Sequence, residues 1–157
     1  MWVDILQVAM IQETSQKKSL KDIANMKDKI KYAMTDSFNN GNYKVLDDLF
    51  SENAAGPDKA QPEGKRGAEG AKELIKNFRE AFPDIHVEVE SQIEEGDKIA
   101  TMWKMSGTHK GKFMGKEATN KKVKISACSV DRISDGKVVE YNTYRDDLRL
   151  MQQIERA

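Results

Sequence analysis

The spacing of apolar residues along the chain changes once, at Pro83. Before Pro83, apolar residues recur every three or four positions over residues 23–40 and 71–82, and more briefly over 45–50, as in amphipathic helices. The first of these stretches ends in Asn-Asn-Gly, a common helix C-cap signal, and Pro83 stops the last one. Residues 51–67 lose the period and contain several glycines and prolines, so we expect a loop there.

After Pro83 apolar and polar residues alternate, which is the pattern of half-buried strands. Two turn signals divide this half of the chain, Glu95-Gly96-Asp97 and Ser134-Asp135-Gly136-Lys137, and the second contains the Asp-Gly pair of a tight hairpin. The elements predicted around these turns are strands over 85–89, 98–108, 121–133 and 138–146 and a helix over 147–154. Helices followed by an antiparallel meander predict an α+β fold, with helices covering one face of a curved sheet.

Length and net charge describe an ordinary single-domain protein. The 157 residues suffice for one domain, which we expect to span 23–157, while 1–22 form an N-terminal appendage, either a short amphipathic helix or a leader-like segment. Twenty-six basic and 26 acidic residues cancel, so no overall field draws the protein to nucleic acid or to anionic membranes. No apolar run approaches the roughly 20 residues that span a bilayer, and we expect a cytoplasmic protein.

Charge is uneven along the chain although the total is zero. Residues 84–97 contain six acids and no Lys or Arg, whereas residues 109–124 contain six lysines and one acid. Two interpretations remain open: solvated ends of hairpins, or a rim that steers anions towards a site.

The last predicted strand carries a candidate acid/base at its end. Asn142, Tyr144 and Asp146 are spaced by two residues, so their side chains project from one face of the strand. A carboxylate flanked by a phenol and an amide suits general acid/base chemistry. Asp146 also precedes the terminal helix, where an aspartate commonly accepts hydrogen bonds from the first turn as an N-cap. The residues alone leave both roles open.

Five short motifs stand in one order along the chain. They are Phe78-Arg79-Glu80-Ala81-Phe82-Pro83-Asp84, Glu95-Gly96-Asp97, Gly107-Thr108-His109-Lys110-Gly111, Asp135-Gly136-Lys137-Val138-Val139-Glu140 and Leu150-Met151-Gln152-Gln153. In this order the chain resembles the SnoaL-like polyketide cyclase (ester cyclase) family of the nuclear-transport-factor-2-like fold. The resemblance covers about residues 26–154.

The resemblance implies a fold, a chemistry and a partner. The fold is a cone-shaped barrel in which a strongly bent sheet wraps around helices, with a pocket in its concave face. Characterised relatives close a ring by intramolecular aldol condensation without metal or cofactor, and an aspartate near the end of the last strand, matching Asp146, acts as acid/base. We therefore expect a cofactor-free enzyme that cyclises or isomerises a small apolar or ring-forming ketone or ester. The alternative is a non-catalytic binding or dimerisation module, since similar proteins form homodimers through the outer sheet face.

Other residues are candidates for the pocket. His109 ends a predicted strand near the expected mouth, where it would act as a proton shuttle or be only a solvent-exposed turn residue. Trp103, Met105, Phe113 and Met114 would line the pocket against a ring-shaped or acyl ligand, or belong to the plain core.

Three further residues are predicted to be structural. Cys128 is expected to be a small buried hydrophobe, Arg132 to form an ion pair, and His86 to be solvated. One cysteine and two distant histidines predict neither a disulfide nor a metal site.

Overall fold

The computed structural model describes residues 19–56 and 65–156. The predicted appendage, 1–22, lies outside these ranges except for its last four residues. Of these, Leu20–Asp22 forms a short 3-10 helix, η1, in which Ser19 and Asp22 make a capping box. Leu20 is buried in the hydrophobic core.

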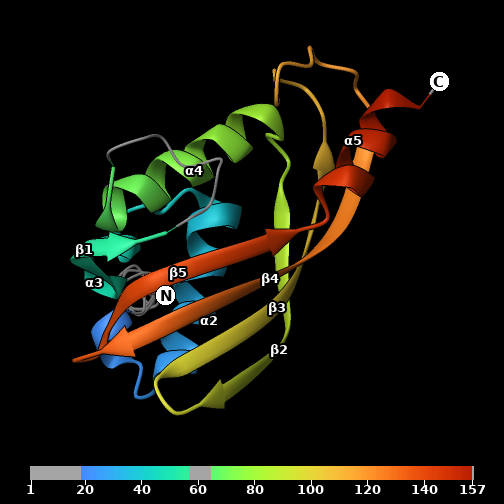
Figure 1. Ribbon diagram of the computed structural model, residues 1–157. Helices are drawn as coiled ribbons and strands as arrows, with labels where there is room; N and C mark the ends of the chain where they lie inside the picture. Colours follow the sequence, from blue (N-terminus) through green and yellow to red (C-terminus); the bar gives the residue numbers. More distant parts are fainter. Residues whose placement is uncertain (1–18, 57–64, 157) are drawn as a thin grey trace, which may run out of the picture.

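The α+β prediction is confirmed, and the predicted elements occur in the predicted order (Figure 1). The four α-helices of the described residues are α2 (Met26–Asn40), α3 (Val45–Leu49), α4 (Gly67–Ala81) and α5 (Asp147–Glu155). The strands are β1 (Phe50–Ala55), β2 (His86–Glu95), β3 (Lys98–Thr108), β4 (Lys122–Ser134) and β5 (Lys137–Arg145). Local signals fix several boundaries: Asn25 caps α2 by accepting a hydrogen bond from the backbone of Asp28, and Gly41, with φ 70°, ends it.

The loop predicted over 51–67 is wrong at its start, because β1 lies there. This strand pairs in parallel with β5, and the complete sheet has the order β1-β5-β4-β3-β2, so it is mixed rather than a pure antiparallel meander. Only Ala54 of β1 is buried, and the strand has no regular alternation of apolar residues that could have revealed it. Its pairing with β5 depends on backbone hydrogen bonds across a long sequence separation, which the local pattern does not encode.

The sheet is bent, and its two faces have different surroundings. Helices α2 and α4 cover the concave face, and in Figure 1 the strands pass in front of α2. Odd-numbered positions of β3 and β4, and of β5 from Tyr141 onward, point to this covered face, as the burial of the strands shows; nearer the start of β5 a register irregularity turns the even position Val138 inward instead. The buried members are Ile99, Thr101, Trp103, Met105, Val123, Ile125, Ala127, Ser129, Asp131 and Tyr141.

Even-numbered positions of β3 and β4 face outward, and Cys128 is one of them. The residue is half-buried on the outer face rather than fully buried in the core as predicted, because the buried face of β4 takes the opposite phase. The other two structural predictions are confirmed: Arg132 forms an ion pair with Glu140 at 2.9 Å, and His86 is exposed. The Arg132–Glu140 pair lies at the surface, where such pairs contribute little stability.

None of the helices in the described ranges is long and apolar enough to cross a bilayer. The cytoplasmic location stays a prediction.

Candidate functional site

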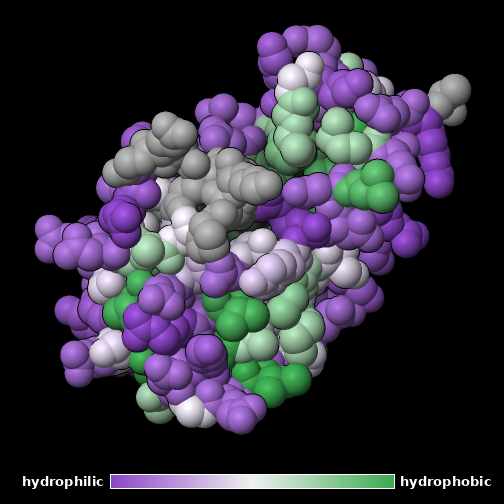
Figure 2. Space-filling model, viewed as in Figure 1, coloured by the Kyte–Doolittle hydropathy of each residue, from purple (hydrophilic) through white to green (hydrophobic). Residues whose placement is uncertain are grey.

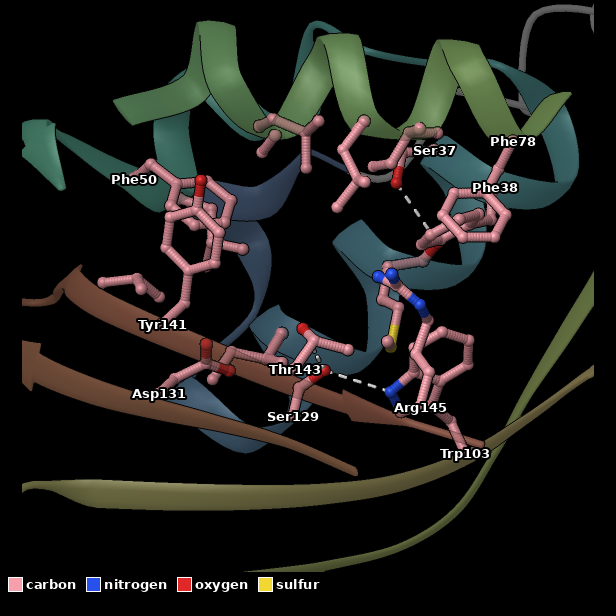
Figure 3. Close-up of a pocket in the computed structure, with 18 residues that line it drawn as sticks. Ser37, Phe38, Phe50, Phe78, Trp103, Ser129, Asp131, Tyr141, Thr143 and Arg145 are labelled. Atoms are coloured by element: carbon pink, nitrogen blue, oxygen red, sulfur yellow. Dashed lines mark hydrogen bonds between the residues drawn. The ribbon is translucent and has the colours of Figure 1, made fainter. Parts of the chain in front are cut away.

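A cavity of about 90 Å³ lies between the concave face of the sheet and helices α2, α3 and α4 (Figure 3). Most of its wall is apolar and much of it is aromatic. The aromatic residues are Phe38, Phe50, Phe78, Trp103 and Tyr141. The sheet contributes a small number of polar side chains to this wall, which is the usual composition of a small-molecule site.

The polar groups form a ladder across β4 and β5. Asp131 lies opposite Tyr141 and Ser129 lies opposite Thr143 in the strand register, and Arg145 is two residues beyond Thr143. The indole Nε1–H of Trp103 donates to Ser129 Oγ at 3.0 Å. Ser129 Oγ and Thr143 Oγ1 are 3.2 Å apart and share a further hydrogen bond. Because the period of a strand is two, this ladder presents every one of these side chains to the same cavity.

Asp131 is the buried carboxyl of the cavity. The residue is 6% exposed, although aspartate is rarely buried. Burial disfavours the charged form and raises the pKa of the Asp131 carboxyl from 3.8 to about 7. Near neutral pH the group therefore exists in both forms, so it can donate a proton or accept one.

Arg145 contributes the cation of the cavity. Its side chain is 6% exposed, and its guanidinium carbon lies 5.1 Å from the centre of the Phe78 ring. Its Nε–H donates to Asp147 Oδ1 at 3.2 Å. In Figure 3 the Arg145 side chain rises from the sheet towards Phe78, while Asp131 lies at the other end of the ladder beside Tyr141. Acid and cation thus mark opposite ends of one cavity.

Asn142, Tyr144 and Asp146 do not line this cavity. Their spacing does put them on the same side of the chain, but that side is the outer one, because in this part of β5 the odd positions line the cavity. Tyr144 is 65% exposed. Asp146 caps α5, with Oδ1 accepting from the backbone N–H of Arg149 at 3.1 Å, and it borders a separate polar groove beside that helix. This geometry supports the cap interpretation of Asp146.

The remaining predicted residues are dispersed. Trp103 lines the cavity, whereas Met105 and Phe113 are buried in the core outside its lining. Met114 is 60% exposed in the loop between β3 and β4. His109 is fully buried beside Phe82, with Nδ1 3.0 Å from Thr119 Oγ1, and it does not reach the cavity either.

Sequence reasoning missed Asp131, although a signal for it exists. The alternation that begins at Val123, Ile125 and Ala127 continues through Ser129 to Asp131, which places a carboxyl on the buried face of β4. A charged residue that continues an apolar alternation marks a candidate site because burying its charge is costly.

Within residues 19–56 and 65–156, no group of three or more His, Cys, Asp or Glu side chains could hold a metal ion.

The fold and the cavity together define a class of protein: a cone-shaped α+β barrel with a largely apolar pocket in its concave face. A model of the SnoaL-like polyketide cyclase family matches residues 29–154, and the chain belongs to this family. The comparison of this chain with curated proteins gives no match.

Solved structures share the fold. TsrD from Streptomyces laurentii is 22% identical with a TM-score of 0.76, and the match covers 83% of this chain and 95% of TsrD. IdmH from Streptomyces antibioticus, a candidate polyketide cyclase, is 26% identical with a TM-score of 0.72, covering 85% of this chain and all (100%) of IdmH. A SnoaL-like polyketide cyclase from Agrobacterium tumefaciens is 18% identical with a TM-score of 0.65, covering 87% and 98%.

Proposed function

We propose that the protein is a cofactor-free enzyme acting on a small ketone or ester, with Asp131 as its general acid/base. The observation that carries the proposal is a buried carboxyl with a raised pKa in an otherwise largely apolar cavity. The reaction we propose is an aldol-type cyclisation or an isomerisation, and family membership supports the cyclisation, because the family is described as polyketide cyclases.

The cavity holds the groups that such a reaction needs. The Asp131 carboxylate takes a proton from the carbon next to the carbonyl, and the electron pair of that C–H bond moves to the carbonyl oxygen to give an enolate. The hydroxyls of Tyr141 and Thr143 lie on the same ladder and can donate to the enolate oxygen. In a cyclisation the enolate carbon then attacks a second carbonyl of the substrate, and the oxygen of that carbonyl takes the proton from Asp131. In an isomerisation Asp131 returns the proton to a different carbon of a conjugated enolate.

Hydrogen–deuterium exchange tests the role of Asp131 without knowledge of the natural substrate. The probe is 4-phenylbutan-2-one, whose ring suits the aromatic wall and whose α-protons are followed by NMR in D2O near pH 8. We expect the wild type to accelerate their exchange and Asp131→Asn to lower the protein-dependent rate by about 100-fold or more. Asp146→Asn is the matched control, because it removes a carboxylate outside the cavity and should leave the rate within about twofold of the wild type.

Each other result points to a different conclusion. Exchange that survives Asp131→Asn but is lost in Asp146→Asn would return the acid/base role to Asp146, with His109 as its predicted helper. A probe that binds in the cavity without any accelerated exchange would favour the alternative, a non-catalytic binding module.

The proposal includes a homodimer formed through the outer face of the sheet. Two neighbouring rows of largely apolar character cross this face, and charged rows border them. The rows are Ala100–Val130–Asn142 and Met102–Cys128–Tyr144. Figure 2, which looks at the side of the sheet away from α2, shows apolar residues gathered over the strands beside hydrophilic ones.

Met102→Lys tests this interface. A lysine in the centre of the rows would place two charges near each other across a face-to-face dimer, and burying them is costly. We expect sedimentation velocity to give a dimer for the wild type and a monomer for the variant. Leu148→Lys is the control, since Leu148 is a solvent-exposed apolar residue on α5 that lies off the sheet. A wild type that sediments as a monomer at micromolar concentration would refute the interface.

A further inference from the structure

The cavity contains a cation that the proposed acid/base chemistry does not use. Arg145 is the basic residue among the described residues that line it, and its side chain is 6% exposed. Taking a guanidinium out of water is costly, and its stacking on Phe78 and its bond to Asp147 offset part of that cost. A guanidinium carries five N–H donors in a planar fork, so it can bind more than one acceptor at once.

We infer that Arg145 is the anion-recognition residue of this cavity and that the substrate carries a carboxylate or another anionic oxygen at the end remote from the reacting carbon. This inference rests on the proposed function in one respect only, namely that the cavity is where the substrate binds. The anion would lie against the guanidinium, with the apolar body of the substrate along the aromatic wall and its reacting carbon beside Asp131.

The strand register sets the scale of such a molecule. Arg145 lies opposite Ala127, and Ala127 is four residues from Asp131 along β4. At about 3.3 Å per residue, the two side chains are attached ~13 Å apart along the sheet. Both project into the cavity and the arginine reaches inward, so the molecule that joins them is roughly 10 Å long. That length corresponds to a substituted ring or a medium acyl chain rather than to a two- or three-carbon acid.

The electrostatics of the cavity favour the same ligand. When Asp131 holds its proton, Arg145, which is bonded to Asp147, provides the formal charge among the described lining residues. An anionic group would form a charge-assisted hydrogen bond in surroundings of low dielectric, where such bonds are strong. A neutral amide of the same shape would gain no comparable interaction.

A pair of matched probes tests the inference. They are 4-phenylbutanoate and 4-phenylbutanamide, which have nearly the same shape and differ in charge. Binding is followed at pH 6 through the NMR signal of the Trp103 Nε1–H group, which lies in the cavity wall, in a Trp2→Phe background that leaves Trp103 as the only tryptophan. We expect the carboxylate to bind about tenfold more tightly than the amide, or better.

Variants at Arg145 should remove the preference rather than the binding. Arg145→Met should bring the two dissociation constants within about threefold of each other while the amide binds as before. Arg145→Lys keeps a charge and should retain part of the preference, so it preserves the test should the methionine variant fail to fold. Lys124→Met removes a cation from the outer groove and should leave the preference unchanged.

The outcomes separate this inference from the proposed function. Equal binding of acid and amide to the wild type, or a preference that survives Arg145→Met, would overturn the role of Arg145 while the exchange assay on Asp131 stands. Conversely, the preference can be measured in Asp131→Asn, where its presence would uphold Arg145 even if no exchange activity is found.

Discussion

At pH 8, Asp131→Asn is expected to increase the free energy of unfolding by roughly 2–4 kcal/mol. The wild-type carboxyl must ionise inside an apolar cavity at this pH, whereas asparagine has almost the same shape and stays neutral. The rise of its pKa from 3.8 to about 7 sets the size of the effect, at about 1.4 kcal/mol for each pKa unit. The upper end of the range applies only if the cavity does not relax around the charge. A variant that disables the proposed chemistry should therefore be more stable than the wild type.

The contribution of Asp131 to the free energy of unfolding decreases as the pH rises. Below about pH 4 the carboxyl is protonated in both the folded and the unfolded protein, and its contribution to stability is fully present. Between about pH 4 and 7 the folded protein holds a proton that the unfolded chain has released, so the free energy of unfolding falls as pH rises. Above pH 7 both states are ionised, and this contribution has been lost.

Other carboxyls act in the opposite direction, so the comparison must be between variants. Hydrogen bonds from Thr108 lower the pKa of Asp84, and Arg132 lowers that of Glu140. Their contributions are present above about pH 4 and are lost as the pH falls through the lowered values. These terms are shared by the wild type and Asp131→Asn and cancel in their difference.

Urea unfolding of both proteins at pH 5, 6, 7 and 8 measures this difference. We expect the difference in unfolding free energy between the two proteins to grow from pH 5 to about pH 7 and to change little above it. Asp146→Asn serves as the control, because a surface cap should change stability by about 1 kcal/mol or less at every pH. Parallel curves for the wild type and Asp131→Asn would show that Asp131 ionises in the folded protein as freely as in water.

Local sequence patterns predicted most of the fold because most helices and strands have sequence signals that mark where they begin or end. The strand predicted over 98–108 has the bounds of β3, since turn signals or changes of period stand at both ends. Helices α2 and α4 combine an apolar stripe with a Gly or Pro stop. Strand β1 has none of these features, and its position next to β5 is a property of the folded sheet. The sequence pattern could not supply that pairing.

The site was harder to predict than the fold for one geometric reason. The two-residue repeat of a strand shows which of its residues share a face, but it does not show which face the helices will cover. Asn142, Tyr144 and Asp146 do share a face, and the helices cover the other one. The burial of Val123, Ile125 and Ala127 would have fixed the phase of β4 and led to Asp131.

Phe78→Ala is expected to lower the free energy of unfolding by about 3–5 kcal/mol, the usual cost of removing a buried phenylalanine ring. Phe78 is 2% exposed and links the aromatic core to the cavity. Its ring centre lies 5.2 Å from that of Phe113 and 6.3 Å from that of Phe38, and the Arg145 guanidinium stacks on it. The truncation would remove these contacts and enlarge the cavity. Chemical denaturation at pH 7 measures the loss, and a loss below about 1 kcal/mol would contradict this account of the core.

Phe113→Ala distinguishes the contribution of Phe78 to core packing from its support of the Arg145 guanidinium. Phe113 belongs to the same aromatic cluster but does not line the cavity, so its truncation should cost a similar free energy of about 3 kcal/mol or more. Only Phe78→Ala, however, removes the ring that supports the Arg145 guanidinium. We therefore expect Phe78→Ala to weaken the preference for 4-phenylbutanoate over its amide and Phe113→Ala to leave that preference intact. If both variants weaken it equally, the orientation of Arg145 depends on the stability of the core as a whole rather than on its contact with Phe78.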